Sequence, residues 1–247
     1  MSRNPGPDAR PAFYALPPGG WRDYWTLLHP PYTVWHLSYV AIGAALAPEL
    51  QVRWWLETML AFFLAMGVSA HALDELHDRP LRTKIPDGVL WGLAAVGLVG
   101  AVALGVQGAI EVTPWLWIAI PLGGFLVVAY NLELFSGAFH SDLWFALAWG
   151  AFPVVVAYLA QTGTLSAGAI VAAVACAGLS LAQRTLSTPV RRLRRDGVDV
   201  TGTLTKRDGT TEALDQAALR AAPEAALRTL SFAVPVLAAA MVIAQLT

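Results

Sequence analysis

Charge is the scarcest feature of this 247-residue sequence. Only 13% of its residues are Asp, Glu, Lys or Arg, whereas soluble domains contain about 25%. The net charge of −1 provides no strongly basic surface, so we expect no nucleic acid partner. The low charge excludes an ordinary soluble globular protein.

Lysine and cysteine are also rare. The only lysines, Lys84 and Lys206, lie in polar segments, so no lysine inside an apolar run could form a Schiff base with retinal. The single cysteine, Cys176, has no partner for an internal disulfide and is read as a small buried core residue. A retinal pigment and a disulfide-stabilised secreted domain are therefore both excluded.

Hydrophobic residues, in contrast, make up 56% of the chain and gather in long apolar runs. Each run is close to the roughly 20 residues that a helix needs to cross a bilayer. We predict an all-α, polytopic integral membrane bundle of about seven transmembrane helices. The predicted spans are 25–47, 54–73, 89–108, 114–132, 143–160, 165–183 and 230–246. Residues 1–20 are proline-rich and are expected to be a disordered tail, and residues 21–247 form a single membrane domain.

The basic residues are distributed unevenly along this pattern. With the N-terminus inside, fifteen of the sixteen Lys and Arg residues lie on the cytoplasmic side and only Arg53 lies outside. Because Lys and Arg near span ends stay in the cytoplasm, we predict the cell (inner) membrane, a cytoplasmic N-terminus and an external C-terminus. Residues 184–229 then form a cytoplasmic segment before the last span, with a short surface helix from Glu212 to Arg228.

The ionisable residues that do occur gather at the inner end of the second span, in residues 71–88. If the helix continues to Asp78, then Asp74 and Asp78 share one face, with their Cβ atoms about 5–6 Å apart. His71 and Glu75 form a second pair with the same spacing. Oxygen-rich ligands of this kind suit Mg²⁺, whereas a zinc site is disfavoured because no thiolate is near.

Basic residues follow this acidic cluster directly. Arg79, Arg82 and Lys84 have the chemistry that a diphosphate needs once its metal is bound. Arg184, at the start of the polar segment, is a further candidate. The alternative interpretation is a solvated helix end whose acids pair with their own arginines.

Several short motifs occur in the order that they have in one known family. They are His29-Pro30-x-x-Thr33, Asp74-x-x-x-Asp78, Arg79-Pro80-x-Arg82-x-x-Ile85-Pro86-x-Gly88, Tyr130-Asn131-x-x-Leu134 and Gly150-x-x-Pro153. Together they cover about residues 25–160 and resemble the UbiA superfamily of intramembrane prenyltransferases. The second acidic motif of that family is largely missing, and only the segment from Asp196 to Leu204 is faintly similar to it.

The resemblance implies a UbiA-like fold and a Mg²⁺-dependent prenyltransferase. Its substrates would be a polyprenyl diphosphate and a lipophilic or aromatic acceptor, taken from the membrane lipid phase. The metal ligands would be Asp74 and Asp78, assisted by Glu75 or His71. The residues expected to bind substrate are Arg79, Arg82, Lys84, Tyr130, Asn131 and Arg184.

His140 lies in the connection between the fourth and fifth spans, on the same side as the acidic cluster. Because an acceptor nucleophile must lose a proton, His140 is a candidate base and joins Asp74 and Asp78 in the predicted catalytic set. The alternative functions are a non-catalytic isoprenoid- or quinone-binding membrane protein and a UbiA-type terpene cyclase. A transporter is disfavoured because the middles of the spans contain almost no charge.

Overall fold

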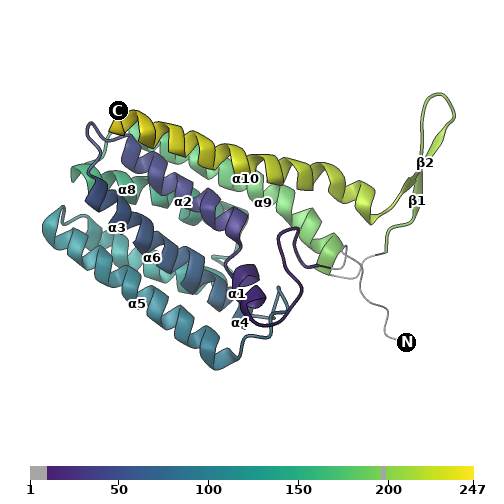
Figure 1. The fold of residues 1–247 in the computed structure, drawn as a ribbon, viewed down its shortest axis with the longest axis horizontal. Helices are drawn as coiled ribbons and strands as arrows, with labels where there is room; N and C mark the ends of the chain where they lie inside the picture. The colour runs from purple at the N-terminus through teal and green to yellow at the C-terminus, as the bar shows by residue number, and fades with distance from the viewer. Residues whose placement is uncertain (1–9, 196–198) are drawn as a thin grey trace.

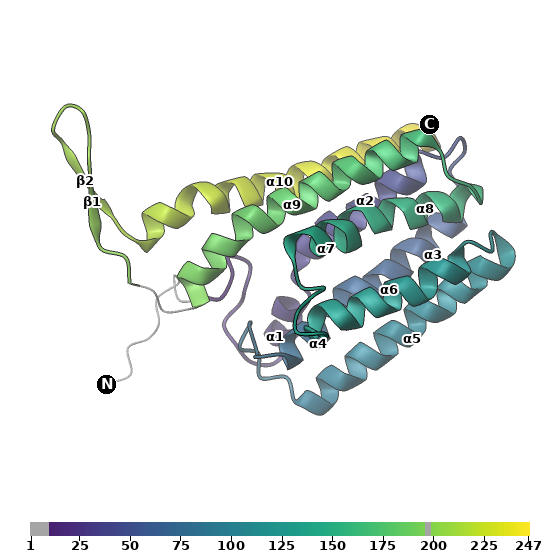
Figure 2. The same ribbon diagram turned by 180° about the vertical axis from the view of Figure 1, so that it is seen from behind.

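The chain folds into a bundle of long helices that run between two ends in alternating directions (Figures 1 and 2). The computed structural model describes residues 10–195 and 199–247. In chain order the elements are α1 (Trp21–Leu27), α2 (Pro30–Ala45), α3 (Val52–Phe62), η2 (Phe63–Ala70), α4 (His71–Leu76), α5 (Asp87–Glu111), α6 (Leu116–Asn131), α7 (Asp142–Ala146), η3 (Leu147–Ala151), α8 (Phe152–Thr162), α9 (Ala167–Arg195), β1 (Gly202–Thr205), β2 (Thr211–Leu214) and α10 (Gln216–Leu246). Apart from the β1–β2 hairpin, the predicted all-α class is confirmed.

Five helical segments in the described part of the chain are long and apolar enough to cross a bilayer. They are Val52–Leu76, Asp87–Glu111, Asp142–Thr162, Ala167–Arg195 and Gln216–Leu246. The remaining predicted spans, 25–47 and 114–132, correspond to α2 and α6, which have 16 residues each. A polytopic membrane protein is therefore supported, with five helices of spanning length.

Small residues allow the helices to approach closely. A Cβ atom added to Gly43 in α2 would lie 2.4 Å from the carbonyl oxygen of Val154 in α8. A Cβ atom added to Gly150 in η3 would lie 2.7 Å from Cα of Ala177 in α9. Membrane helices associate through such small-residue contacts. These glycines therefore set the close spacing between α2 and α8 and between η3 and α9.

Two of the spans contain π-helical segments, η2 and η3. The wider turn of a π-helix changes which side chains share a face, and such segments are frequent at functional sites. The hydroxyl of Ser69 in η2 donates to the carbonyl of Ala94, 2.8 Å away, and ties η2 to α5. η2 leads directly into His71, and η3 contains Trp149, so both segments aim side chains at one end of the bundle.

Residues 10–20 correct the prediction of a disordered tail, whose residues 1–9 lie outside the described part. Residues 10–20 form a strap across the end of the bundle, called the N-terminal strap below. The amide of Leu16 donates to Oγ1 of Thr26 at 3.0 Å, and Ala15 is fully buried. The ring of Phe13 lies 6.1 Å from that of Tyr32. These side chains bury enough surface to order a segment whose prolines alone indicate disorder.

In the predicted cytoplasmic segment 184–229, most of the described residues are helical. Helices α9 and α10 both continue beyond the rest of the bundle, and the β1–β2 hairpin lies between them in the chain (Figure 1). Asp215 caps α10 by accepting a hydrogen bond from the amide of Ala218, 2.8 Å away. The predicted surface helix from Glu212 to Arg228 begins too early, because residues 212–214 lie in β2. Its remainder from Gln216 is the first part of α10, whose Ala- and Leu-rich sequence favours helix.

Candidate functional site

A polar cavity of about 330 Å³ lies at the end of the bundle covered by the N-terminal strap. All five histidines of the chain line it: His29, His36, His71, His77 and His140. They come from distant parts of the sequence, so only the fold brings them together. A concave site with converging polar groups is the leading candidate for a binding or catalytic site.

Three arginines of α9 line the same cavity: Arg184, Arg191 and Arg195. At about 100° per residue, their spacings of seven and four residues place them within an arc of about 40° on one helix face. Only Arg184 is among the predicted site residues. The three arginines share a face because α9 continues beyond the predicted span 165–183 as far as Arg195.

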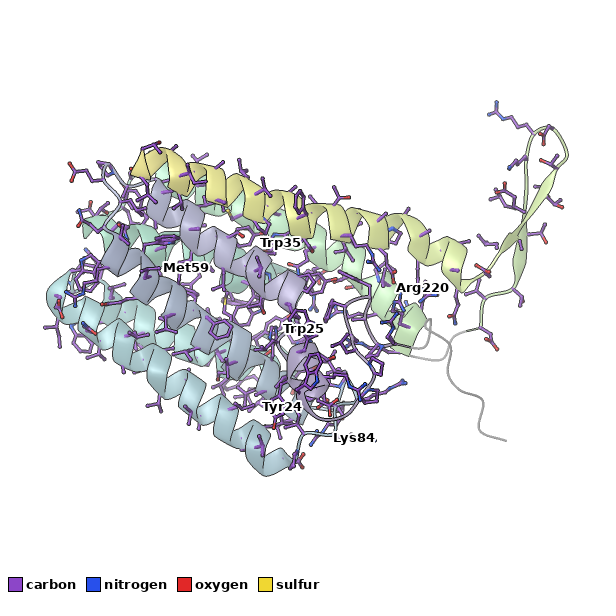
Figure 3. The ribbon with its side chains drawn as sticks, in the orientation of Figure 1. Tyr24, Trp25, Trp35, Met59, Lys84 and Arg220 are labelled. Carbon is purple, nitrogen blue, oxygen red and sulfur yellow. The ribbon has the colours of Figure 1, made fainter. Side chains whose placement is uncertain are left out.

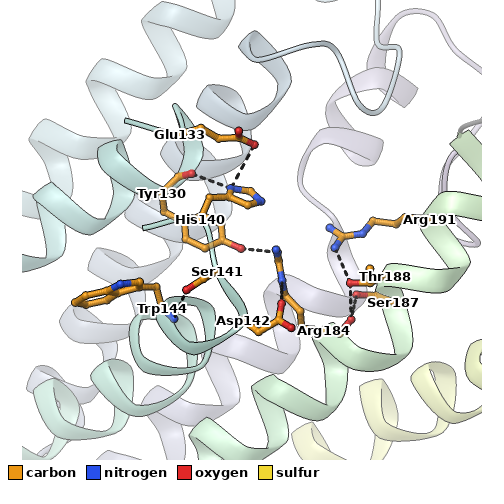
Figure 4. A network of polar contacts seen from close by, with 10 residues as sticks. All are labelled: Tyr130, Glu133, His140, Ser141, Asp142, Trp144, Arg184, Ser187, Thr188 and Arg191. Atoms are coloured by element: carbon orange, nitrogen blue, oxygen red, sulfur yellow. Dashed lines mark hydrogen bonds and ion pairs between the residues drawn. The ribbon is translucent and has the colours of Figure 1, made fainter. Parts of the chain in front are cut away.

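Arg184 is held firmly in the cavity wall (Figure 4). Its Nε donates to Oδ1 of Asp142 at 2.7 Å, and its Nη1 donates to the hydroxyl of Tyr130 at 2.5 Å. The guanidinium also lies 5.5 Å from the centre of the Phe145 ring. Arg184 is therefore oriented by its neighbours before any ligand binds.

Arg191 and Arg195 are less constrained. Arg191 Nη2 donates to Oγ1 of Thr188 at 3.3 Å (Figure 4), and Arg195 Nε donates to the carbonyl of Pro11 at 3.5 Å. Within the described residues, neither guanidinium has a carboxylate oxygen within 4.0 Å. Two partly buried guanidinium groups without a carboxylate at ion-pair distance favour the binding of an anion.

The predicted pair of aspartates does not share a helix face. Asp74 lines the cavity, but α4 ends at Leu76, and Asp78 adopts a left-handed conformation with φ of 64°. The Asp78 side chain lies at the rim of the cavity and is 94% exposed. The expected face with the two carboxylates one turn apart is therefore wrong, because the helix ends before it can form.

Glu75 is fully buried and does not line the cavity. Its Oε2 accepts a hydrogen bond from the amide of Leu81 at 2.9 Å. Its Oε1 accepts from the amide and from the hydroxyl of Thr83, both at 2.8 Å. The Glu75 carboxylate thus fixes the loop after α4. These hydrogen bonds explain why Glu75 is buried, without the metal ion expected there.

The carboxylates at the cavity do not fit the magnesium site that the family resemblance implies. In residues 10–195 and 199–247, no three His, Cys, Asp or Glu side chains are grouped so as to hold a metal ion. Of the acids on α4 and in the turn after it, Asp74 and Asp78 line the cavity, and the Asp78 side chain is 94% exposed. Asp74 interacts electrostatically with Arg191 and Arg195. Asp196, in the segment resembling the second acidic motif, lies outside the described residues.

The three basic residues predicted to bind diphosphate lie outside the cavity lining. Arg79 donates to the carbonyl of Ile85 at 2.7 Å, and Arg82 donates to the carbonyl of Arg195 at 3.0 Å. Lys84 is exposed at the edge of the bundle (Figure 3). The loop that carries these residues folds back on itself, so Arg79 and Arg82 support the rim while α9 supplies the cations of the cavity.

Tyr130, Asn131 and His140, which are among the predicted site residues, lie in the cavity wall. Nδ1 of His140 donates to the carbonyl of Tyr130 at 3.0 Å, and the two rings stack with centres 4.5 Å apart (Figure 4). Glu133 Oε1 lies 3.6 Å from the same nitrogen. Because a carbonyl only accepts, Nδ1 carries a proton and the neutral ring keeps its lone pair on Nε2.

A pair of histidines lines another part of the cavity. The rings of His29 and His71 have their centres 4.2 Å apart. Nδ1 of His71 donates to the carbonyl of Gly67 at 3.1 Å, and Nε2 of His29 is buried without a hydrogen-bond partner in the described structure. Each ring therefore keeps a nitrogen for a ligand.

The N-terminal strap supplies residues that the sequence patterns do not single out. Tyr14 lines the cavity, with its ring 5.4 Å from that of His29 and 5.4 Å from that of Tyr32. Burial raises the pKa of the Tyr14 hydroxyl, so the group stays protonated at neutral pH. The strap also lies against α9 through Pro11, so it covers the cavity beside the arginines.

An apolar pocket of about 100 Å³ adjoins the polar cavity. Met66 and Trp149 line both spaces. The pocket lies between α3, η2, α5, α6, η3 and α8, and Gly105, Gly123 and Gly124 form part of its wall. The combined space suits an amphipathic ligand with an anionic head and an apolar tail.

No family model, curated protein or solved structure matches the chain. The functional argument therefore depends on the residues of this cavity.

Proposed function

We propose that this protein is a UbiA-like intramembrane enzyme that transfers the prenyl group of a polyprenyl diphosphate to a lipophilic or aromatic acceptor. The observation that carries the proposal is the junction of the two spaces at Met66 and Trp149. A prenyl diphosphate is divided in the same way, into a doubly phosphorylated head and a hydrocarbon tail. The arginine-lined cavity fits the head, and the apolar pocket fits the first part of the tail.

The arginines of α9 have the geometry to bind the head. Guanidinium groups bind phosphate oxygens in a bidentate manner, and such charge-assisted hydrogen bonds are stronger than neutral ones. Arg184 is oriented by Asp142 and Tyr130. Arg191 and Arg195 line the same cavity, and no carboxylate of the described structure lies at ion-pair distance from either. Fixed cations stabilise the negative charge that develops on a departing diphosphate.

Aromatic side chains surround the position where the head meets the tail. Tyr130, Phe145 and Trp149 line the cavity, and the Tyr130 and Trp149 rings meet edge to face with centres 5.6 Å apart. When the carbon–oxygen bond to diphosphate breaks, positive charge develops on the allylic carbon. A cation–π contact stabilises such charge by about 0.5–2 kcal/mol.

The acceptor must lose a proton as the new bond to the prenyl carbon forms. His140 is the proposed base, because its Nδ1 proton is bound to the Tyr130 carbonyl and Nε2 is left to accept a proton. The diphosphate leaves with the electron pair of the broken bond, and the proton of the acceptor moves to Nε2. Asp74, on the same cavity wall as His71, is close enough to α9 to influence the charge of the arginines.

The proposal is tested by pyrophosphate release from the purified, membrane-reconstituted protein. Prenyl diphosphates of several lengths are supplied with a lipid extract as the source of acceptor, with Mg²⁺ and, separately, with EDTA. We expect release with at least one length, lowered at least tenfold by Arg191→Gln and unchanged by Arg192→Gln, which replaces an exposed arginine on the same helix. Tight binding of the lipid without release at any length would instead favour the non-catalytic isoprenoid-binding function.

A further inference from the structure

We infer that the cavity binds the diphosphate head through the arginines of α9 and does not require a divalent cation to do so. The inference rests on the proposed lipid diphosphate as the ligand, but it concerns how the head is held rather than whether a prenyl group is transferred.

The first argument is the supply of positive charge. Arg191 and Arg195 are one helical turn apart, about 6 Å along the axis of α9, and both line the cavity. Arg184 lies on the same face and is already oriented by Asp142. A diphosphate placed beside this face is within reach of several guanidinium groups, which supply the charge that a carboxylate-bound metal supplies elsewhere.

The second argument is that the acidic side chains near the cavity, apart from Asp74, either contact other groups or are exposed to solvent. Both oxygens of Glu75 are bonded to the loop after α4, and Asp78 is 94% exposed. Glu133 is directed at imidazoles, 3.6 Å from His140 and 4.0 Å from His77. Asp74 remains as a single carboxylate among cations, which is a poor site for a metal of high charge density but a good one for an anion.

The two ways of holding the head give opposite expectations for Asp74. If a divalent cation bridges Asp74 and the diphosphate, Asp74→Asn removes a metal ligand and weakens binding. If the arginines hold the diphosphate directly, Asp74→Asn removes no ligand of the head and takes away an acidic group that competes with the anion for Arg191 and Arg195, so binding is unchanged or stronger. A loss of pyrophosphate affinity in Asp74→Asn therefore indicates the metal bridge, and an unchanged or higher affinity indicates direct binding by the arginines.

The experiment is titration calorimetry of the purified, full-length protein with inorganic pyrophosphate, first in EDTA and then in excess Mg²⁺. We expect binding in EDTA, with an affinity that Asp74→Asn leaves unchanged or increases. Arg191→Gln is expected to weaken binding at least tenfold, because it removes a charged donor. Arg192→Gln, on the exposed side of α9, is the matched control and is expected to bind like the unmodified protein. Arg195→Gln serves as the second variant if Arg191→Gln does not fold.

Binding of pyrophosphate only in Mg²⁺, and its loss in Asp74→Asn, would overturn the inference. The two proposals fail separately. Binding in EDTA without release from any prenyl diphosphate removes the proposed transferase and leaves the inference standing. Release of pyrophosphate from a prenyl diphosphate, together with pyrophosphate binding that depends strictly on Mg²⁺ and on Asp74, supports the transferase and removes the inference.

Discussion

Glu75 and Thr83 are joined by two hydrogen bonds to one carboxylate oxygen, from the amide and from the hydroxyl of Thr83, each 2.8 Å long. Because Glu75 is fully buried, we expect Glu75→Gln to destabilise the protein by about 1–3 kcal/mol for each donor left without an acceptor. The loss is measured as a lower thermal unfolding midpoint in detergent, in EDTA and in Mg²⁺ alike.

Asp78→Asn is the matched control for this prediction, because the Asp78 side chain is 94% exposed. We expect it to unfold at the same temperature as the unmodified protein. Equal stability of Glu75→Gln and Asp78→Asn, with a loss of Mg²⁺-dependent stabilisation in both, would contradict the structural role of Glu75.

Arg184 and Asp142 form an ion pair whose partners differ in exposure, the arginine side chain being 12% exposed and the aspartate side chain 63%. If Arg184 contacts the diphosphate, Arg184→Gln should lower kcat/KM at least a hundredfold, whereas Asp142→Asn should lower it only a few-fold. The prediction is checked by steady-state kinetics of pyrophosphate release. Equal losses in the two variants would indicate that the pair only supports the wall.

His140 offers a test that separates a base from a structural residue. Asparagine can replace the donor at Nδ1 that binds the Tyr130 carbonyl, but it has no group at the position of Nε2. We therefore expect His140→Asn to keep its thermal stability and its pyrophosphate affinity while turnover falls by about 10²–10⁴-fold. Full turnover in His140→Asn would contradict the role of this histidine as base.

Gly124 tests the apolar pocket. Gly124 lines the pocket, and a Cβ atom added there meets its nearest neighbour, Leu98 Cδ1, only at 4.0 Å, so a larger side chain can begin there without a clash at Cβ and take up pocket space. We expect Gly124→Leu to raise KM for the prenyl diphosphate at least tenfold and to leave the affinity for inorganic pyrophosphate unchanged. Gly92 lies at an exposed position of α5, and an added Cβ atom there has no neighbour within 4 Å. Gly92→Leu is therefore the control and should change neither the KM for the prenyl diphosphate nor the affinity for pyrophosphate.

The orientation in the membrane is tested with two exposed threonines at opposite ends of the bundle, Thr210 in the hairpin and Thr164 between α8 and α9. In a Cys176→Ala background, we expect Thr164→Cys to react with an impermeant maleimide in intact cells. Thr210→Cys should react only after the membrane is opened. The reverse pattern would place the cavity on the outer side and contradict the inference from the basic residues.

The sequence predicts the helices better than it predicts their ends. Apolar runs locate the helices, because a helix that crosses lipid must be apolar over its length. In a chain with little charge, the concentration of ionisable residues at 71–88 identifies Asp74 and His71, which line the cavity. The end of α4 cannot be read from the sequence, since it depends on hydrogen bonds that Glu75 makes with a loop.

The sequence does not predict that Arg191 and Arg195 line the cavity, because the end of α9 is also hidden from hydropathy. Hydropathy follows only the part of a helix that lies in lipid, so it gives no sign that α9 continues to Arg195 and aligns Arg184 with Arg191. The N-terminal strap depends on tertiary contacts between Phe13, Tyr14 and α2 that no local pattern contains. Site residues held by long-range contacts are therefore the ones that sequence patterns leave out.

The most direct test of the central claim is an experimental structure with a non-reactive prenyl diphosphate analogue bound. The account predicts that the phosphate oxygens lie within hydrogen-bond distance of Arg191 and Arg195, with the first isoprene unit passing between Met66 and Trp149. A head group bound elsewhere, or a tail that leaves the cavity without entering the apolar pocket, would contradict it.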